Sequence, residues 1–248
     1  MNRITLANMF LAVLLSSCTH YYYVANVQNV PLFREKNEFR FSGTAGNGDE
    51  SNYIELQSAY SISDKIGIMA NFMSASGGAV SDNSYGKGNY LDGAIGYYKP
   101  IGKSGVFEIY GGLGGSRQHH QYEKNSTADL SFTKLFVQPS FGLTFKPFDI
   151  AFSTRICRLA FNSTDNNSYL YNPNNLSSDR RNELNTVVNK NHFFLEPALT
   201  IRAGWKNVKL QFQAEYANVS GREDLNFVEK QHISLGLIFA IADRYKKK

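Results

Sequence analysis

The sequence predicts an all-β fold, an antiparallel up-and-down transmembrane β-barrel of about ten strands. Three observations support this prediction: apolar and polar residues alternate, one hairpin is duplicated, and the connections between strands alternate in length. The alternation is clearest in residues 132–161, where two amphipathic segments flank the turn 146–149. A period of two is typical of strands with one apolar face. Because Pro147 and Asp149 favour turns, this stretch is an expected β-hairpin.

The hairpin has a second copy later in the chain. Phe-Val-Gln-Pro-Ser-Phe-Gly-Leu at 136–143 aligns with Phe-Leu-Glu-Pro-Ala-Leu-Thr-Ile at 194–201. Such self-similarity indicates a repeating structural unit. Each copy carries a proline within its strand, Pro139 or Pro197. A closed barrel has no edge where a missing N–H is harmless, so a β-bulge is expected at both prolines.

The other strands follow from the same alternation. In chain order the expected strands are 39–45, 53–60, 66–74, 90–98, 106–114, the two arms of 132–161, 193–203, 208–217 and 232–241. The best candidate for a helix is the short polar run 179–188, which lies inside a long connection.

The connections alternate in length. The short ones are 61–65, 100–105, 146–149 and 205–207, and those between them are 47–52, which is modest, and 75–89, 115–131, 162–191 and 218–231, which are long. In an up-and-down meander, every tight turn then lies at one end together with both termini, and every long loop lies at the other. This layout is typical of outer-membrane barrels.

The polar faces of the expected strands carry charges of both signs, whereas the apolar faces carry none. The charged residues expected to line the lumen are Arg40, Glu55, Asp92, Glu108, Lys134, Arg155, Glu196, Arg202, Lys209 and Glu215. Aromatic residues near strand ends fit an interfacial girdle. They are Tyr60, Tyr97, Tyr98, Phe145, Trp205 and Tyr216.

Alternation alone does not determine which face is inside. A soluble lipocalin-like barrel would use the apolar face as its core and would bind an apolar ligand, so that alternative stays open. If the polar face is inside, the lumen is expected to be mostly plugged. Eight strands are just filled by side chains and porins use ~16 strands for an aqueous channel, so ten strands with long charged side chains leave little space.

The N-terminal residues predict an exported lipoprotein. Arg3 precedes the apolar run 6–15, and Leu15-Ser16-Ser17-Cys18 resembles the lipobox of bacterial lipoproteins, in which the Cys thiol is acylated. The alternative is an ordinary cleaved signal peptide that contains a cysteine. The expected organisation is a signal peptide at 1–17, a tether at 18–37, a β-barrel at 38–244 and a basic tail at 245–248.

Composition excludes several classes of protein. The net charge of +5 comes from scattered Lys and Arg, and an exported chain meets no nucleic acid, so no nucleic-acid partner is expected. With Cys18 acylated, Cys157 is the remaining thiol and no intramolecular disulfide is available. No apolar run of eighteen residues follows residue 18, so membrane insertion would be by strands.

The two proline-containing segments at 136–143 and 194–201, with the hairpins around them, resemble the porin-like outer-membrane β-barrel domains of Bacteroidetes-type bacteria. The resemblance implies one barrel over 38–244. The chain departs from that family at its end, where three lysines follow Tyr245 instead of a terminal aromatic residue.

No motif predicts catalysis, and no cofactor or metal site is expected. His119-His120 lies in an expected loop, and adjacent histidines project in different directions, so we expect a solvated loop. His232-Ile233-Ser234 resembles the His-x-Ser dyad of outer-membrane barrels that deacylate lipid A, which is an alternative function. In the expected strand, however, this pair faces inward, whereas a lipid-cleaving dyad must meet the bilayer.

The predicted function is that of a lipid-anchored outer-membrane barrel with a structural, surface-binding or narrow-channel role. Its expected partners are outer-membrane lipids, through acylated Cys18 and the barrel exterior, and an extracellular ligand at the long loops. The loop 162–191 is the best candidate for recognition, because it is rich in asparagine and contains tyrosine and arginine side chains. They are Tyr169, Tyr171, Arg180 and Arg181. Both termini are expected on the periplasmic side.

Overall fold

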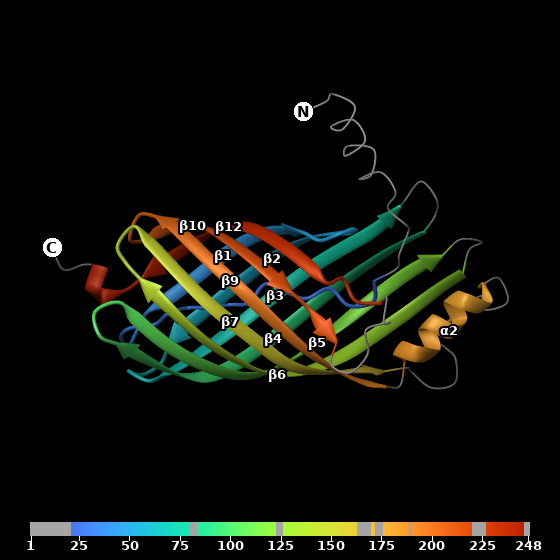
Figure 1. Cartoon of the computed structure of the whole chain (residues 1–248), viewed down its shortest axis with the longest axis horizontal. Helices are drawn as coiled ribbons and strands as arrows, with labels where there is room; N and C mark the ends of the chain where they lie inside the picture. Colours follow the sequence, from blue (N-terminus) through green and yellow to red (C-terminus); the bar gives the residue numbers. More distant parts are fainter. Residues whose placement is uncertain are drawn as a thin grey trace, which may run out of the picture.

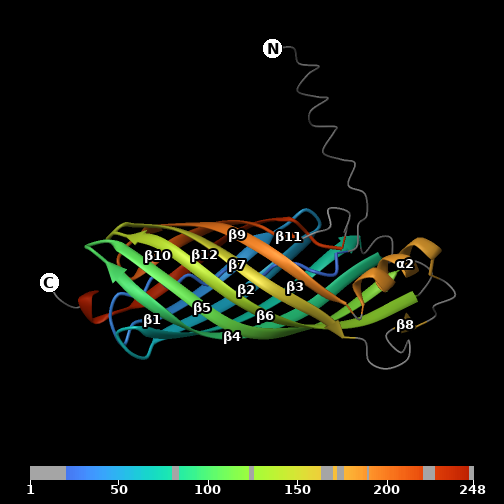
Figure 2. The same cartoon turned by 60° about the horizontal axis from the view of Figure 1, so that its bottom comes forward.

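The alternating segments form ten long strands that close into an antiparallel barrel (Figures 1 and 2). The computed structural model describes residues 21–79, 84–122, 126–162, 170–171, 176–188, 190–219 and 227–245. The barrel strands are β1 (Phe39–Asn47), β2 (Ser51–Ser61), β3 (Ile66–Ala79), β4 (Ser84–Ile101), β5 (Gly105–Tyr122), β6 (Ser126–Thr144), β7 (Phe148–Asn162), β9 (Asn191–Gly204), β10 (Val208–Tyr216) and β12 (Gln231–Ile241). The smaller elements are β8 (Leu170–Tyr171), α2 (Ser178–Val187), β11 (Asn218–Val219) and the 3-10 helix η5 (Asp243–Tyr245).

Antiparallel pairing between the first and last strands closes the barrel. Each long strand pairs with the next along the chain, and β12 pairs with both β10 and β1. The predicted fold class and strand number are therefore confirmed. None of the helices within the described residues is long and apolar enough to cross a membrane.

The two prolines within strands are accommodated without the predicted bulges. Pairing between β6 and β7 stops after Val137 and resumes at Ser140 in the same register, so no residue is inserted around Pro139. Pro197 faces Thr154 in an uninterrupted register between β7 and β9. The bulge prediction is wrong, because the flanking ladder hydrogen bonds hold the register while each proline forgoes its own N–H bond.

The two ends of the barrel differ in their connections. We call the end with the connections 62–65, 102–104, 145–147 and 205–207 the turn end, and the opposite end the loop end. At the loop end, the hairpins β3–β4 and β5–β6 cover most of the segments predicted as long loops at 75–89 and 115–131, so those loop predictions are wrong. The segment 75–89 is rich in Gly and Ser and the segment 115–131 in polar and charged residues, so neither shows the apolar alternation that indicates a lipid-facing strand. The polar run 179–188 forms most of helix α2, as expected.

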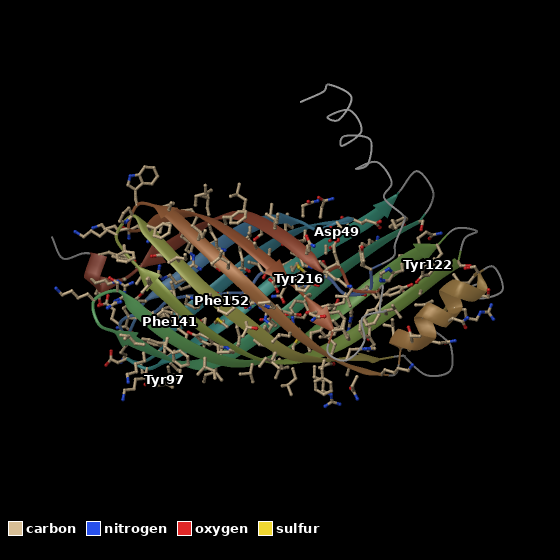
Figure 3. All side chains as sticks on the ribbon, in the orientation of Figure 1. Asp49, Tyr97, Tyr122, Phe141, Phe152 and Tyr216 are labelled. Atoms are coloured by element: carbon tan, nitrogen blue, oxygen red, sulfur yellow. The ribbon has the colours of Figure 1, made fainter. Side chains whose placement is uncertain are left out.

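The apolar faces of the strands point outward around the whole barrel. Phe141 on β6 and Phe152 on β7, both labelled in Figure 3, are 48% and 57% exposed. Among the predicted girdle residues, Trp205 is 80% exposed at the turn end, whereas Tyr98 is fully buried and faces the lumen. The girdle assignment of Tyr98 is therefore wrong, because it falls on the inward phase of β4 next to Tyr97.

An arginine on this outer face is expected to lower the stability of the barrel most when it lies near the middle of the bilayer. Leu235, half exposed near the middle of β12, should lose ~2–4 kcal/mol of membrane-protein stability as Leu235→Arg, because a guanidinium would enter hydrocarbon. The control Trp205→Arg, in a turn, should cost about 0–1 kcal/mol. Urea unfolding in lipid vesicles measures both. Equal costs at the two positions would contradict a lipid-facing belt.

Residues 21–37 pass through the interior of the barrel, and we call them the lumen segment. Figure 2 shows this part of the chain, in blue, enclosed by the strands. Most of its side chains are buried, including Tyr22, Val27, Gln28 and Phe33 at 1% exposure or less. The tether predicted at 18–37 is therefore wrong for residues 21–37. The absence of periodicity suggested a flexible spacer, but the polar lumen side chains pair with this segment instead.

The ends of the described chain lie at opposite ends of the barrel. Tyr22 lies at the loop end, where its hydroxyl bonds to that of Tyr122, and the backbone N–H of Arg244 donates to Glu35 Oε1 at the turn end. The prediction placed both termini with the tight turns; the N-terminal residues 1–20 lie outside the described residues, and the first described residues lie at the loop end because the chain passes through the lumen before β1.

Candidate functional site in the barrel lumen

All ten charged residues predicted to line the lumen are buried inside the barrel. They come from eight of the strands, and none is more than 7% exposed: Arg40, Glu55, Asp92, Glu108, Lys134, Arg155, Glu196, Arg202, Lys209 and Glu215. The structure thus places the polar faces inside, where the lumen segment provides their partners.

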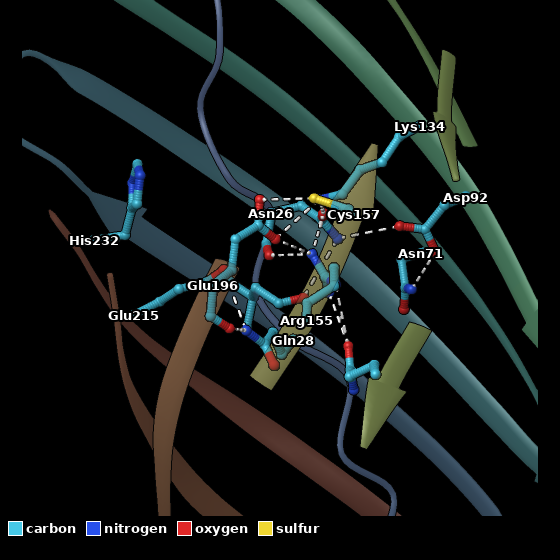
Figure 4. Close-up of polar contacts among 12 residues, drawn as sticks. Asn26, Gln28, Asn71, Asp92, Lys134, Arg155, Cys157, Glu196, Glu215 and His232 are labelled. Carbon is cyan, nitrogen blue, oxygen red and sulfur yellow. Dashed lines mark hydrogen bonds and ion pairs between the residues drawn. The ribbon is translucent and has the colours of Figure 1, made fainter. Parts of the chain in front are cut away.

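Glu196 on β9 is the centre of a buried charged cluster (Figure 4). Its Oε2 lies 3.2 Å from Lys134 Nζ and 3.4 Å from Arg155 Nη1. The Tyr23 hydroxyl of the lumen segment donates to Glu196 Oε1 and accepts a hydrogen bond of 2.6 Å from Lys134 Nζ. A buried carboxylate is tolerated only with opposite charge and hydrogen-bond donors around it, and these three side chains supply both.

Asn26 of the lumen segment bridges this cluster to the opposite wall. Arg155 Nη1 donates to the Asn26 side-chain oxygen at 2.7 Å and to its backbone oxygen at 3.2 Å. The Asn26 amide nitrogen in turn donates to Asp92 Oδ2 at 3.2 Å. One neutral side chain therefore separates a guanidinium on β7 from a carboxylate on β4 and satisfies both.

The next two residues bond to lumen side chains through their backbone. Val27 N–H donates to Glu55 Oε2 at 2.8 Å, and Val27 O accepts from Gln57 Nε2 at 2.7 Å. Gln28 N–H donates to Gln213 Oε1 at 2.7 Å, and Gln28 O accepts from Gln213 Nε2 at 2.9 Å. Side chains of the wall thus replace the neighbouring strand that would otherwise satisfy this buried backbone.

A sharp turn follows before the segment leaves the lumen. Arg202 Nη2 donates to Val30 O at 2.7 Å, and the N–H groups of Leu32 and Phe33 both donate to Glu108 at 3.0 Å. Leu32 has a φ of 56°, in the left-handed region. Such a residue lets successive N–H groups converge on one anion, and here that anion is the Glu108 carboxylate.

Hydrogen bonds and one ion pair secure the segment at the turn end. Arg34 Nη2 donates to Gly102 O at 2.9 Å, and the Arg34 N–H donates to Glu38 Oε1 at 2.8 Å. Arg244 forms an ion pair with the same Glu38 carboxylate, which joins the two ends of the strand sequence. Burial raises the pKa of the neighbouring Tyr245 hydroxyl, but nearby guanidinium groups outweigh burial and lower that pKa below its ordinary value.

A second set of contacts, which we call the latch, holds the segment at the loop end. The N–H groups of Tyr22 and Tyr23 donate to Phe227 O at 2.8 and 3.1 Å, and Glu229 N–H donates to Tyr23 O at 3.0 Å. The Glu229 carboxylate accepts a hydrogen bond of 3.0 Å from Ser51 N–H at the start of β2. The latch therefore joins the lumen segment, the connection before β12 and the barrel wall.

The two adjacent histidines lie on β5 and not in the predicted solvated loop. His120 is 3% exposed and its ring centroid lies 4.9 Å from that of Tyr22, while His119 Nδ1 lies 2.7 Å from Asp129 Oδ1 on β6. The β5–β6 hairpin is longer than its sequence suggested, which explains the error. Among the described residues, no group of three or more His, Cys, Asp and Glu side chains is placed to hold a metal ion.

The remaining candidate residues from the sequence do not form a common site. His232 and Ser234 on β12 are buried inside the barrel, and His232 Nε2 lies 2.8 Å from Glu229 O. Cys157 is buried with its Sγ 3.4 Å from Glu196 Oε1. Cys18 lies outside the described residues, as does Tyr169.

The recognition residues proposed for 162–191 are only partly described. Arg181 is exposed on α2, and Tyr171 belongs to β8, which pairs with β6.

A cavity of about 60 Å³ lies at the loop end, beside the start of the lumen segment. Tyr21, Tyr90, Gln118 and others line it. Its mixed aromatic and amide walls could accept ordered water or a small polar group.

Among known proteins, similarity to this chain is found in solved structures. No protein-family model matches the chain, and no curated protein matches it significantly. The solved structures similar to it include a KdgM porin, with 10% identity, 82% of this chain and 99% of that chain covered, and a TM-score of 0.38. The outer membrane protease OmpT from Escherichia coli has 9% identity, coverages of 83% and 97%, and a TM-score of 0.47.

A third similar structure is the translocator domain of the autotransporter NalP from Neisseria meningitidis. It has 9% identity, coverages of 83% and 86%, and a TM-score of 0.44. At identities of 9–10% and TM-scores below 0.5, these likenesses assign neither a family nor a role to this chain. The Bacteroidetes-type resemblance stays a prediction, and the function must come from the chain's own residues.

Proposed function

We propose that this protein is an outer-membrane β-barrel whose own N-terminal segment occludes the lumen, and that it acts by surface binding without conducting solutes. The observation that carries this proposal is the buried lumen segment, which passes from the latch to Glu38 through hydrogen bonds with both walls. The apolar outer faces and the tight turns at one end support the outer-membrane location.

Occlusion follows from how the lumen is filled. A barrel of ten strands is only slightly wider than one that side chains fill by themselves. Here Lys134, Arg155 and Glu196 enter the lumen together with a complete backbone segment, and all three are at most 1% exposed. A hydrated ion would have to displace several buried hydrogen bonds to pass.

Surface binding is the role that the loop end supports. Helix α2 and the extended β3–β4 and β5–β6 hairpins lie at that end, mounted on a rigid barrel (Figure 1). Binding residues are often found on loops that a rigid scaffold positions. We propose no catalysis, because the His232 and Ser234 side chains are enclosed in the lumen and away from the apolar outer face.

Planar-bilayer recording tests the proposed function. The full-length protein, refolded and inserted, should show no steady ionic current above the bare bilayer. Stable conductance steps from the wild-type chain would contradict occlusion and favour a narrow channel. That second candidate has one observation in its favour: the backbone oxygens of Val27 and Gln28 are bonded by glutamine side chains of the wall, and water can replace such bonds.

We also propose that Cys18 is acylated after cleavage behind Ser17. The support is the sequence Leu15-Ser16-Ser17-Cys18 after an apolar run. A single acyl chain binds membranes weakly, whereas several hold firmly. Cys18→Ala should therefore abolish incorporation of labelled palmitate into the barrel, while Cys157→Ala, the control at the other cysteine, should leave it unchanged. Label that persists in Cys18→Ala would disprove the anchor.

A further inference from the structure

We propose that the chain enters its own barrel from the cell surface, so that the residues before Tyr21 and any lipid on Cys18 lie at the outer leaflet. This inference rests on the proposed function for one point: surface binding at the loop end places that end on the outside of the cell. The partner it names is a lipid surface, the acyl layer around the outer rim of the barrel.

The direction of the lumen segment is established by contacts at both of its ends. At the loop end the Tyr22 hydroxyl accepts a hydrogen bond of 3.1 Å from Tyr122, the last residue of β5. At the turn end Arg34 Nη2 reaches Gly102 O, in the tight connection between β4 and β5. The segment therefore runs from the loop end to the turn end before β1 begins.

The reach of the preceding residues is short. Three residue steps separate Cys18 from Tyr21, so the Cys18 Cα lies within about 11 Å of the Tyr21 Cα. The passage from Tyr22 to Arg34 needs four times as many steps. A lipid on Cys18 therefore cannot reach the membrane leaflet at the turn end.

A return path through the lumen is also closed. Tyr22, Tyr23 and Gln28 are at most 1% exposed, and the walls around them are occupied by the Glu196 cluster. A second strand of chain would have to displace this cluster. The N-terminal end is therefore confined to the side on which Tyr21 lies.

The latch holds the lumen segment through specific hydrogen bonds at the point where it enters the barrel. Phe227 O accepts from two successive N–H groups of the segment, and Tyr23 and Val228 form a parallel bridge. The Glu229 carboxylate then ties this point to β2 through Ser51. The segment is thus bonded to the connection before β12, and that connection is bonded to β2. Together these bonds hold Tyr22 and Tyr23 at the loop end.

A protease site inserted between His20 and Tyr21 tests the inference. Protease added to intact cells should remove the N-terminal peptide, and the full-length band should be lost in favour of the barrel band. Palmitate label, if present, should leave the barrel with that peptide. Normal heat-modifiable migration of the uncut protein shows that the insertion has not prevented folding.

Two matched insertions make the result decisive. The same site after Asn174 should be cut on intact cells, and the site after Lys103, in a tight turn, should be cut only after permeabilisation. Protection at Tyr21 with cutting at Asn174 would overturn the entry direction. If the sites at Tyr21 and Asn174 were both protected while the site after Lys103 was cut, the loop end would face the periplasm. That result would overturn the surface location and the orientation in the proposed function. Cutting at Tyr21 without palmitate label would leave the entry direction supported and remove only the lipid anchor.

Discussion

Deletion of residues 21–33 is expected to turn a closed barrel into an ion-conducting pore. The deletion removes the backbone and side chains that fill the lumen from the latch to the Glu108 carboxylate, and water should occupy the space. The lumen groups that lose their partners, including Gln213 and Gln57, can bond to that water. Planar-bilayer recording should show discrete conductance steps that the full-length chain does not show.

The control for this experiment keeps the segment but weakens one of its contacts. Gln28→Ala removes the side-chain hydrogen bonds to Glu196 O and Glu215 Oε1. The backbone of residue 28 keeps both of its hydrogen bonds with Gln213, so this variant should stay closed. Heat-modifiable migration confirms a folded barrel for each variant before recording. A folded deletion variant that conducts no more than Gln28→Ala would show that the lumen segment is not the occluding element.

The lumen segment was the part of the fold that the sequence predicted least well. The strands were predictable because each alternates with a period of two between lipid and lumen, and the ten lumen charges followed from the same phase. Asn26, Val27 and Gln28 show no such period. Their backbone is satisfied by side chains from several strands, so neither face of the segment needs to be apolar.

One signal in the sequence could have revealed the lumen segment. The inward faces of the strands carry amide side chains, such as Gln57, Gln138 and Gln213, besides the charged ones, and a closed interior requires each to find a partner. The lumen segment supplies part of these partners, since Gln138 and Gln213 both donate to its backbone oxygens. The extended hairpins at the loop end were missed for another reason: beyond the bilayer, backbone pairing can continue without an apolar face.

Loss of the Glu196 carboxylate is expected to be the most destabilising single change in the lumen. Glu196→Ala leaves Lys134 and Arg155 buried without their shared anion, and breaking a buried ion pair from one side costs about 3–5 kcal/mol. Tyr23 also loses the acceptor of its hydroxyl, which loosens the lumen segment. Urea unfolding in lipid vesicles measures the change in the free energy of unfolding.

Glu215→Ala is the matched control for that change. Glu215 is also a lumen glutamate, but its contact with the segment is a single hydrogen bond of 3.4 Å from Gln28 Nε2, so its loss should cost only about 1 kcal/mol. The double variant Glu196→Ala with Lys134→Met should be more stable than Glu196→Ala alone, because one unpaired buried cation is removed with its partner. If Glu196→Ala and Glu215→Ala cost the same, or if Lys134→Met adds a full second penalty, the cluster does not stabilise the occluded barrel as an ion pair.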